Sequence, residues 1–298
     1  MSITNKVPTL FHTSNVCEWL NHLQTEGYVV ISNILNINDY NTAVSLFKTD
    51  WCSVSSKWDW NDSTTWENNM PVVKKTGQAM FSGFGQSDFM WFLRTRPAFQ
   101  DCYSHIHNTN NICVSMDGFS FYCSTTQKPG SWLHRDQRSS DLSYSVQGAY
   151  NILPVTETSA GFICVPRSHR EIYENGNRDF VPSVNRDCIK LIIPSNCYVL
   201  WNSKTIHACS GMAQRSPKHI NRVTAFITYA PRNSLDGTVR TARMCAYRDG
   251  KACSHWAHRC EIKRYPNFFK KTYESKGFGE IVPTLCEGEI PSERSMLI

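Results

Sequence analysis

From about residue 112 onward the chain becomes a succession of short apolar runs separated by turn residues, and this pattern most constrains its fold. Runs of this kind that follow one another without helices between them are typical of antiparallel structures, because parallel strands need long helical crossovers. The sequence therefore predicts a mainly β fold with flanking helices, organised as a jelly-roll barrel (a double-stranded β-helix). The expected strands are Cys113–Ser115, Phe119–Cys123, Ser145–Leu153, Gly161–Val165, Cys188–Ile193, Cys197–Trp201 and Arg222–Tyr229.

Helical periodicity precedes this β-rich region. Ser14 followed by apolar positions up to residue 23 predicts a capped amphipathic helix that stops before Gly27, and Tyr28–Ser32 reads as a short strand. A second helix is expected from about residue 38 to residue 48, and residues 87–108 read as helical with an interruption at a proline.

We expect one domain over residues 1–298, because no internal repeat or linker-like tract is visible. Its parts would be a mostly helical segment 1–110, a jelly-roll core 111–232 and a basic C-terminal extension 233–298. With 41% apolar residues, the chain has ample material for a packed core, which excludes a disordered protein.

The chain carries no sign of a membrane protein. No apolar run approaches the ~18 residues that a membrane span needs, and the first residues lack the apolar core of a secretion signal. The 13 cysteines include no Cys-x-x-Cys pair, so we expect them to be mostly reduced and buried. These features predict a soluble, cytoplasmic protein.

Positive charge concentrates in the C-terminal third, where residues 215–276 hold 14 Lys and Arg against 4 Asp and Glu. Such a segment suits an anionic substrate or nucleic acid, although an excess of this kind is more often an ordinary solvated surface. The basic residues are spread out, and no recognisable stacking-aromatic motif accompanies them. A small anionic molecule is therefore the favoured partner over nucleic acid.

Three elements in the β-rich region could together form a metal site. His134 and Asp136 are separated by one residue, so on an extended segment both side chains project to the same face. His207 follows a later strand and could complete the set. Two histidines and one carboxylate on one face leave open positions, the arrangement associated with non-haem Fe(II) oxygenases.

Arg222 and Thr224 share one face of the expected strand that begins at residue 222. A guanidinium can hold a carboxylate with two parallel hydrogen bonds, and a hydroxyl can add a third. An arginine that points into a barrel is costly unless an anion meets it, although a protein carboxylate would serve as well as a ligand.

Two other histidine sets compete less well. His169 and Glu171 also have the His-x-carboxylate form, but they follow a turn-like Pro-Arg-Ser and no close strand aims them inward, so we interpret them as a structural turn. His105 and His107 lie in an expected helix, where side chains two positions apart diverge.

The order of these elements resembles the phytanoyl-CoA dioxygenase-like Fe(II)/2-oxoglutarate oxygenases over roughly residues 25–230. The segments that resemble the family are Glu26-Gly-Tyr-Val-Val-Ile-Ser, Trp132-Leu-His-Arg-Asp-Gln137, Gly161-Phe-Ile-Cys-Val-Pro-Arg-Ser-His-Arg170, His207 and Arg222. In the third segment, Arg167 stands where the family's turn has glycine.

The resemblance implies a cupin-like fold and an oxidative activity. His134, Asp136 and His207 would bind Fe(II), Arg222 would hold the distal carboxylate of 2-oxoglutarate, and Thr224 would assist it. Tyr122 or Ser120 are candidates for further cosubstrate contacts. O2 and 2-oxoglutarate would be consumed while an unactivated C–H bond is hydroxylated, or while the substrate is cyclised or desaturated.

Two positions bear on how closely the family's chemistry transfers. Ala208 and Cys209 follow the second histidine where many relatives have Gly-Ser, so one cosubstrate hydrogen bond would be missing or replaced. Asp136 argues against the halogenase branch, which has a small residue there. As a whole the chain also resembles algal or large-virus members of the family, which include the kainoid synthases; the kainoid branch would imply secondary metabolism and an N-prenylated amino acid as substrate.

We expect positively charged side chains at the entrance to the site, beside the metal-binding motif, where they would orient a small carboxylated substrate. Arg135 would turn away from the metal face toward the rim, and Arg138 and Lys74 would add charge. Lys74 and Trp66 belong to the tryptophan-rich stretch 51–75, which reads equally well as a lid or as packing over the barrel wall.

Other functions stay open. An oxygenase acting on nucleic acid or protein, and a non-catalytic binding barrel, are the alternatives to a small-molecule oxygenase. The tail holds four zinc-type ligands within eight residues, and these could bind zinc or form an ordinary core cluster: Cys253, His255, His258 and Cys260.

Overall fold

The computed structural model describes residues 2–73, 77–123, 133–138, 140–172, 186–211, 219–264, 273 and 275–298. The strands in chain order are β1 (Ser2–Lys6), β2 (Leu10–Phe11), β3 (Tyr28–Ile31), β4 (Gln78–Ala79), β5 (Ile112–Val114), β6 (Phe119–Cys123), β7 (Val146–Asn151), β8 (Gly161–Cys164), β9 (Asp187–Leu191), β10 (Cys197–Asn202), β11 (His207–Ser210), β12 (Ile220–Phe226) and β13 (Tyr229–Pro231). The helices are α1 (Val16–Glu26), α2 (Ile37–Val54), α3 (Asp88–Arg94), α4 (Pro97–His107), α5 (Gly237–Arg248) and α7 (Ser292–Ser295), with short 3-10 turns η1 (Ser63–Thr65), η2 (Phe84–Gln86), η3 (Ser168–Arg170) and η4 (Arg232–Ser234).

The chain divides into two compact units whose segments alternate along the sequence. The first unit comprises Met1–Ile34 and Tyr122–Thr224, and the second comprises Leu35–Phe121 and Ala225–Ile298. Of the three boundaries, one lies between β3 and α2, and the other two fall within strands β6 and β12.

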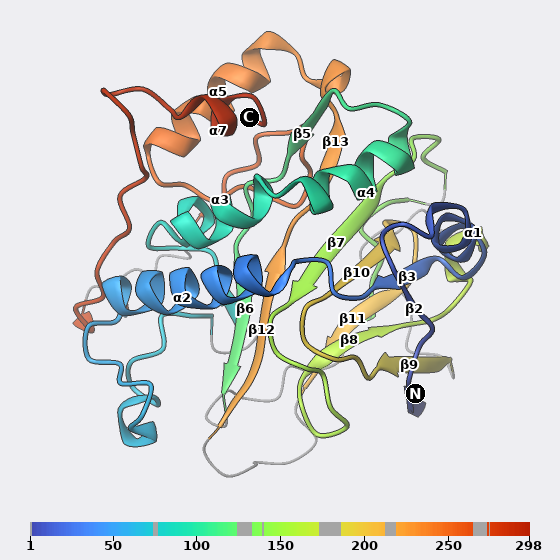
Figure 1. The fold of residues 1–298 in the computed structure, drawn as a ribbon, viewed down its shortest axis with the longest axis horizontal. Coiled ribbons are helices and arrows are strands. Elements are labelled where there is room, and N and C mark those ends of the chain that lie inside the picture. Colours follow the sequence, from blue (N-terminus) through green and yellow to red (C-terminus); the bar gives the residue numbers. More distant parts are fainter. Residues whose placement is uncertain are drawn as a thin grey trace. The chain divides into compact units, whose positions relative to one another are not determined.

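The first unit is a jelly roll built from two sheets (Figure 1). One sheet has the order β1-β9-β8-β11, and the other contains β2-β3-β10-β7-β12. The central strand β10 pairs antiparallel with both neighbours, so that Leu200 lies opposite Val29 on one side and opposite Gly148 on the other. The mainly β fold with flanking helices is confirmed, and among the described residues the sheets keep free edges and do not close into a barrel.

A glycine brings the end of α1 close to the turn between β10 and β11. Gly27 ends the helix with a left-handed conformation (φ 81°), and its carbonyl accepts hydrogen bonds from Asn202 N at 3.0 Å and Thr205 Oγ1 at 2.8 Å. A Cβ at this position would lie 2.7 Å from Thr205 Oγ1, so only glycine fits. This contact fixes the turn that leads directly into His207.

The second unit contains α2, α3, α4, α5 and α7 with the pairs β4–β6 and β5–β13. α2 continues to Val54, six residues beyond the expected end, because Ala43, Phe47, Trp51 and Val54 extend one buried stripe along the helix. α1 begins after Asn15 rather than Ser14, and no side chain caps it.

The tryptophan-rich stretch is packed into an aromatic cluster of this second unit. Trp51, Trp58 and Trp66 are at most 6% exposed, and the last two rings stack with centroids 5.3 Å apart. Trp51 also lies against Phe121, at 4.2 Å between centroids. Packing is therefore the role that the structure shows for these rings.

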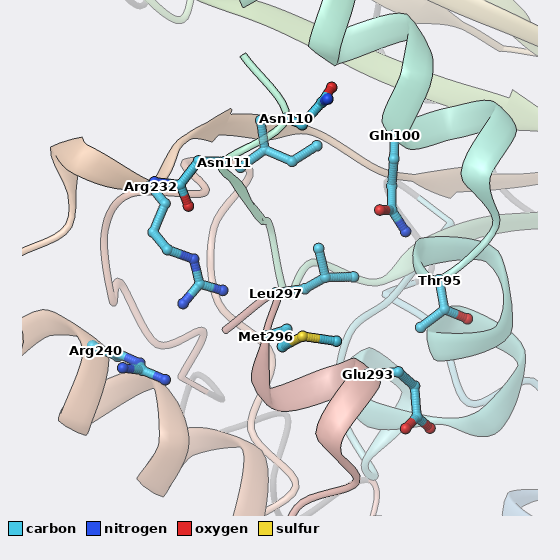
Figure 2. Close-up of a pocket in the computed structure, with 10 residues that line it drawn as sticks. Thr95, Gln100, Asn110, Asn111, Arg232, Arg240, Glu293, Met296 and Leu297 are labelled. Carbon is cyan, nitrogen blue, oxygen red and sulfur yellow. The ribbon is translucent and has the colours of Figure 1, made fainter.

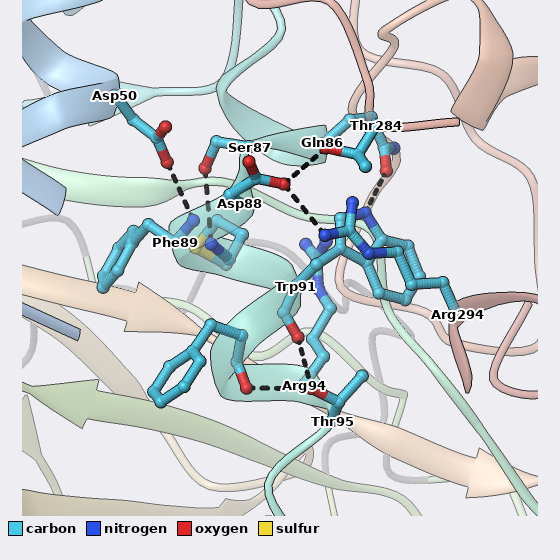
Figure 3. A network of polar contacts seen from close by, with 12 residues as sticks. Asp50, Gln86, Ser87, Asp88, Phe89, Trp91, Arg94, Thr95, Thr284 and Arg294 are labelled. Carbon is cyan, nitrogen blue, oxygen red and sulfur yellow. Dashed lines mark hydrogen bonds and ion pairs between the residues drawn. The ribbon is translucent and has the colours of Figure 1, made fainter. Parts of the chain in front are cut away.

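Polar contacts organise the start of α3 (Figure 3). Ser87 caps the helix by accepting from Met90 N, and Asp50 of α2 accepts from Phe89 N at 2.8 Å. Asp88 accepts from Thr284 Oγ1 and from Arg294 Nη2, both at 2.8 Å. These polar groups are thus matched to one another, with Asp50 and Ser87 buried and Asp88 and Thr284 nearer the surface.

The strands lie close to the predicted runs, with one division. The expected run Arg222–Tyr229 is split into β12 and β13, since Thr228 leaves the ladder to exchange hydrogen bonds with Ser115. Within the described part of the chain, every helix is too short or too polar to cross a lipid bilayer.

Candidate metal centre and anion site

His134, Asp136 and His207 converge in the first unit. One potential ligand atom from each lies within 4.8 Å of the others, and the described residues contain no other such group of three. Asp136 Oδ2 is 3.2 Å from His207 Nε2, and Asp136 Oδ1 is 3.7 Å from His134 Nε2. The three side chains predicted as ligands are therefore brought together, and their mutual spacing allows one ion to contact all three.

Backbone pairing sets this arrangement. His134 and His207 form an isolated antiparallel bridge, and the amide of each donates to the carbonyl of the other at 3.0 Å. Asp136 N donates to Ser203 O at 3.2 Å, which anchors the segment after the first histidine to the turn before β11. The two-residue spacing then returns the carboxylate to the face of both imidazoles.

The imidazole of His207 is held in one tautomer. Its Nδ1 lies 2.9 Å from Thr205 O, and because a carbonyl can only accept, Nδ1 must carry the proton. Nε2 is then left with a free lone pair on the side of Asp136. Metal-binding histidines commonly donate a hydrogen bond from the ring nitrogen that does not bind the metal, and this bond fixes the orientation of the ring.

Gln147 supports the carboxylate from strand β7. Its Nε2 donates to Asp136 Oδ2 at 2.7 Å and lies 3.4 Å from Ser203 Oγ. Gln147 is 4% exposed, so this amide is part of the interior. Sequence analysis missed its role, although a glutamine in an otherwise apolar, buried strand is a signal that could have found it.

The three candidate ligands differ in exposure. The side chains of His134 and Asp136 are 15% and 18% exposed, whereas His207 is 8% exposed. The Phe162 ring is stacked with the His207 ring at 5.8 Å between centroids, and the Trp201 centroid lies 5.2 Å from that of His207. Phe162 and Trp201 are both buried, so aromatic rings pack against the imidazole of His207.

Arg222 lies buried in the same unit, 4% exposed, and is held by a chain of hydrogen bonds. Its Nε donates to Thr224 Oγ1 at 2.8 Å, and this hydroxyl donates to Asn151 Oδ1 at 2.8 Å. The single hydroxyl proton of Thr224 is thus used to position the arginine. Asn151 was not singled out from the sequence, although it lies four residues after Gln147 on the same face of β7.

Cys209 and Tyr122 complete the surroundings of this guanidinium. Arg222 Nη1 donates to Cys209 Sγ, and the guanidinium carbon lies 5.8 Å from the Tyr122 ring centroid. Burial, followed by the nearby Cys209, raises the pKa of Tyr122 well above its ordinary value, so the phenol stays neutral. Among the described residues, no carboxylate pairs with Arg222.

Lys190 adds a second buried cation nearby. Its Nζ donates to Glu157 O at 2.8 Å and Ser159 O at 2.5 Å. Burial lowers the pKa of Lys190 to about 8, against weaker opposing effects of Cys209 and Glu157. The charge of Arg222 also lowers this pKa, so two cationic side chains lie near each other in the first unit.

Among the described residues, those expected to contact substrate do not gather at the metal centre as the three candidate ligands do. Arg135 is turned away from the metal face as expected, but it is 2% exposed and donates to Ser168 O at 2.6 Å and Glu171 O at 3.0 Å. Arg138 is exposed, and Lys74 lies outside the described residues. Trp66 lies in the second unit and donates from Nε1 to Asp59 O at 2.7 Å.

The competing histidine set forms a turn. His169 belongs to η3, and its Nε2 lies 3.0 Å from Gln24 O, while Glu171 pairs with Arg186 at 2.6 Å. Arg167 precedes this turn at φ 66°, the left-handed conformation that a glycine would favour, and it pairs with Glu26 at 2.8 Å. A left-handed turn thus forms here without a glycine.

The tail cluster does not form a metal site among the described residues. Cys253 and Cys260 have their sulfurs 4.0 Å apart, but neither His255 nor His258 joins them in a set of three ligands. The His255 and His258 rings instead lie near Trp256, with their centroids 4.7 and 5.8 Å from the centroid of the Trp256 ring. The core-cluster interpretation fits this geometry better than zinc.

No protein-family model matches this sequence, and no curated protein does either. Solved structures do resemble the fold. One is the non-heme alpha-ketoglutarate-dependent carbocyclase SnoK from nogalamycin biosynthesis, with 12% identity, a TM-score of 0.53, and alignment of 74% of this chain to 87% of that chain. Another is the epimerase SnoN in complex with Fe3+, alpha-ketoglutarate and nogalamycin RO, with 11% identity, a TM-score of 0.50, and alignment of 72% of this chain to 83% of that chain. At this identity the likeness establishes a shared fold.

Proposed function

We propose that this chain is an Fe(II)- and 2-oxoglutarate-dependent oxygenase that oxidises an unactivated C–H bond of a small, carboxylated metabolite. The observation that carries the proposal is the pairing of two features in one unit. A His-Asp-His set lies ready to bind a metal, and Arg222 lies buried without a carboxylate partner among the described residues. A buried guanidinium of this kind needs an anion, and 2-oxoglutarate supplies one.

The donor set fits iron. Two imidazole nitrogens and one carboxylate oxygen are the ligands that non-haem Fe(II) enzymes use on one face, with other positions left open. The Thr205 carbonyl fixes the tautomer of His207, and Gln147 holds Asp136, so the residues behind the site are those of a metal centre. The solved structure of the neighbour SnoN contains Fe3+ and alpha-ketoglutarate, which supports the same cofactors here.

Iron, when bound, supplies the oxidation by O2 that is coupled to conversion of 2-oxoglutarate into succinate and CO2. The chain's residues perform the binding and orientation. Arg222 holds the distal carboxylate of the cosubstrate, and Thr224 and Asn151 keep the guanidinium in place. Phe162 and Trp201 shield the rear of the site from water.

The reaction outcome within this class is hydroxylation or oxidative cyclisation. The solved neighbours are a carbocyclase and an epimerase, so one fold supports several outcomes. The order of motifs supports a phytanoyl-CoA dioxygenase-like enzyme, and the overall similarity to kainoid synthases supports an N-prenylated amino acid as substrate. Arg138 and Lys74 stay proposed substrate contacts, whereas the packing of Trp66 in the aromatic cluster removes it from this set.

The test is 2-oxoglutarate turnover with a matched pair of variants. Asp136→Ala should lower succinate formation at least about 100-fold, because the carboxylate ligand is lost. Glu171→Gln changes the other His-x-carboxylate motif and should keep turnover close to wild type. Circular dichroism checks that both variants fold. Full turnover by Asp136→Ala would overturn the assignment.

A substrate screen distinguishes the alternatives. Amino-acid-derived and other carboxylated metabolites are compared with oligonucleotides and peptides for stimulation of succinate release. Stimulation by a small acid supports the proposal, whereas stimulation only by a polymer would favour a nucleic-acid or protein oxygenase. Failure to bind Fe(II) or turn over 2-oxoglutarate at all would favour a non-catalytic binding protein.

A further inference from the structure

The second unit contains a pocket of about 400 Å³ that the proposed reaction does not use (Figure 2). The α3–α4 junction, the start of α4 and the loop that enters β5 form one side, α5 and η4 form another, and the C-terminal residues around α7 form the third. Its lining residues are Thr95, Gln100, Asn110, Asn111, Ile112, Arg232, Arg240, Glu293, Met296 and Leu297.

The charges around this pocket are unbalanced. Arg232 and Arg240 line it together, and Glu293 is the one acidic residue in its lining. Within the described part of the chain, neither arginine forms an ion pair, whereas other surface arginines such as Arg248 do. Arg240 lies in the first turn of α5, whose N-cap Asp236 accepts from Val239 N and forms no ion pair with Arg240 among the described residues.

Arg232 carries an unmatched donor. Its Nη2 is buried and has no hydrogen-bond partner among the described residues, which is unusual because buried polar groups are nearly always paired. Burial, and then the neighbouring Arg240, lower the pKa of Arg232. Figure 2 shows the guanidinium pointing inward, toward the part of the pocket that Arg240 and Leu297 border.

The pocket walls are fixed by backbone contacts. Arg232 N donates to Asn111 O at 2.8 Å, and Val114 N donates to Leu297 O at 2.9 Å. Arg243, fully buried, donates from Nε to Ile298 O at 3.0 Å. Because three separate parts of the sequence are tied together around it, the pocket is a built feature rather than a gap between loops.

The lining defines the chemistry of a ligand. Two guanidinium groups supply charge-assisted donors for an oxyanion, and the arginine fork suits carboxylate and phosphate geometry. Asn110, Asn111 and Gln100 offer amide groups, and Ile112, Met296 and Leu297 supply apolar contact. The combination suits a small organic molecule with one anionic end and an uncharged polar remainder.

We propose that this pocket is a second ligand site, which binds a small organic anion through its carboxylate or phosphate group at Arg232 and Arg240. Carboxylate and phosphate share the recognising chemistry, so the two sources are separated by experiment. The proposal uses no residue of the metal centre and is independent of the proposed oxygenase activity.

The test is isothermal titration calorimetry at low ionic strength with inorganic phosphate and with citrate as probes. We expect saturable binding of at least one probe to the full chain. Arg232→Gln should weaken it at least about tenfold, and Arg240→Gln about threefold, because one charge-assisted contact is lost in each. Arg248 lies on α5, as Arg240 does, but outside the pocket. Arg248→Gln should therefore leave the affinity for both probes unchanged.

Arg232→Lys provides a second variant that keeps the charge and loses the fork, so it should fall between wild type and Arg232→Gln. Tighter binding of citrate would assign a carboxylate ligand, and tighter binding of phosphate would assign a phosphate ester; either supports the proposal. Equal affinity in wild type and folded Arg232→Gln would overturn it, as would absence of binding of both probes up to about 10 mM.

Discussion

Gln147 Nε2 donates to Asp136 Oδ2 across 2.7 Å, and this contact places a β7 side chain directly behind the expected metal ligand. Four residues further along the same strand, Asn151 accepts from Thr224, which accepts from Arg222. At about 3.3 Å per residue, the two side chains lie roughly 13 Å apart on one face of the strand. β7 therefore carries the supports of both the metal centre and the anion site.

Replacing Gln147 tests the first support. Gln147→Ala should weaken Fe(II) affinity by about 10- to 100-fold, since the carboxylate of Asp136 loses the amide that orients it. Anaerobic titration with Fe(II), or with Co(II) as a spectroscopic probe, measures this without relying on turnover. Gln24→Ala, an exposed glutamine of α1, is the control and should bind metal like wild type. An unchanged affinity in Gln147→Ala would contradict an orienting role.

Arg222 variants test the anion site. Arg222→Lys keeps the charge but loses the two-pronged geometry, and Arg222→Ala loses both, so the KM for 2-oxoglutarate should rise in that order. Steady-state kinetics with varied cosubstrate give the result. A change confined to the KM of the organic substrate would instead assign Arg222 to the substrate pocket.

Thr224→Val separates positioning from direct contact. Valine has the same shape as threonine but removes the hydroxyl between Arg222 and Asn151, so the guanidinium loses its fixed orientation. We expect a rise of several-fold in the KM for 2-oxoglutarate, smaller than that of Arg222→Ala. A Thr224→Ser variant retains the hydroxyl and should restore most of the affinity. A Thr224→Val enzyme with wild-type KM would argue that the hydroxyl chain is dispensable.

The sequence predicted the jelly-roll region and its convergent residues because both depend on short-range patterns. Alternating apolar runs define strands locally, and a two-residue spacing places His134 and Asp136 on one face wherever that segment lies. The position of His207 was harder to predict, because it is brought to the other two ligands by a backbone bridge to His134, some seventy residues away in the chain. Here the family's order of motifs supplied what local periodicity could not.

The partners of buried polar side chains could not be predicted, because they depend on strand pairing between distant segments. Gln147 lies opposite Trp201 in the β7–β10 ladder, and nothing near it in sequence identifies Asp136 as its acceptor. Arg135 was correctly expected to face away from the metal ligands. That it would be buried against the Ser168 carbonyl followed only from the fold.

Arg94 offers a stability prediction in the second unit. It is fully buried and donates to Gly85 O at 2.7 Å and Asp117 O at 2.6 Å. Arg94→Met leaves two carbonyls unpaired and should lower the free energy of unfolding by about 2–4 kcal/mol. Arg96→Met removes a partly exposed arginine 3.6 Å from Asp39 and should cost less than about 1 kcal/mol. Urea unfolding compares the two, and equal losses would contradict the difference in burial.

Asp50 should make the stability of the second unit depend on pH. Burial raises the pKa of this carboxyl from 3.8 to about 6, and the hydrogen bond from Phe89 N only partly opposes the change. Between those two values the folded state binds more protons than the unfolded state, so the contribution of Asp50 to stability falls as pH rises through the window. Asp50→Asn keeps an acceptor for Phe89 N but cannot ionise. Relative to wild type, this variant should therefore gain stability on the order of 3 kcal/mol between pH 4 and pH 7. Urea unfolding at several pH values measures both curves, and parallel curves for the two proteins would rule out Asp50 as the source of the dependence.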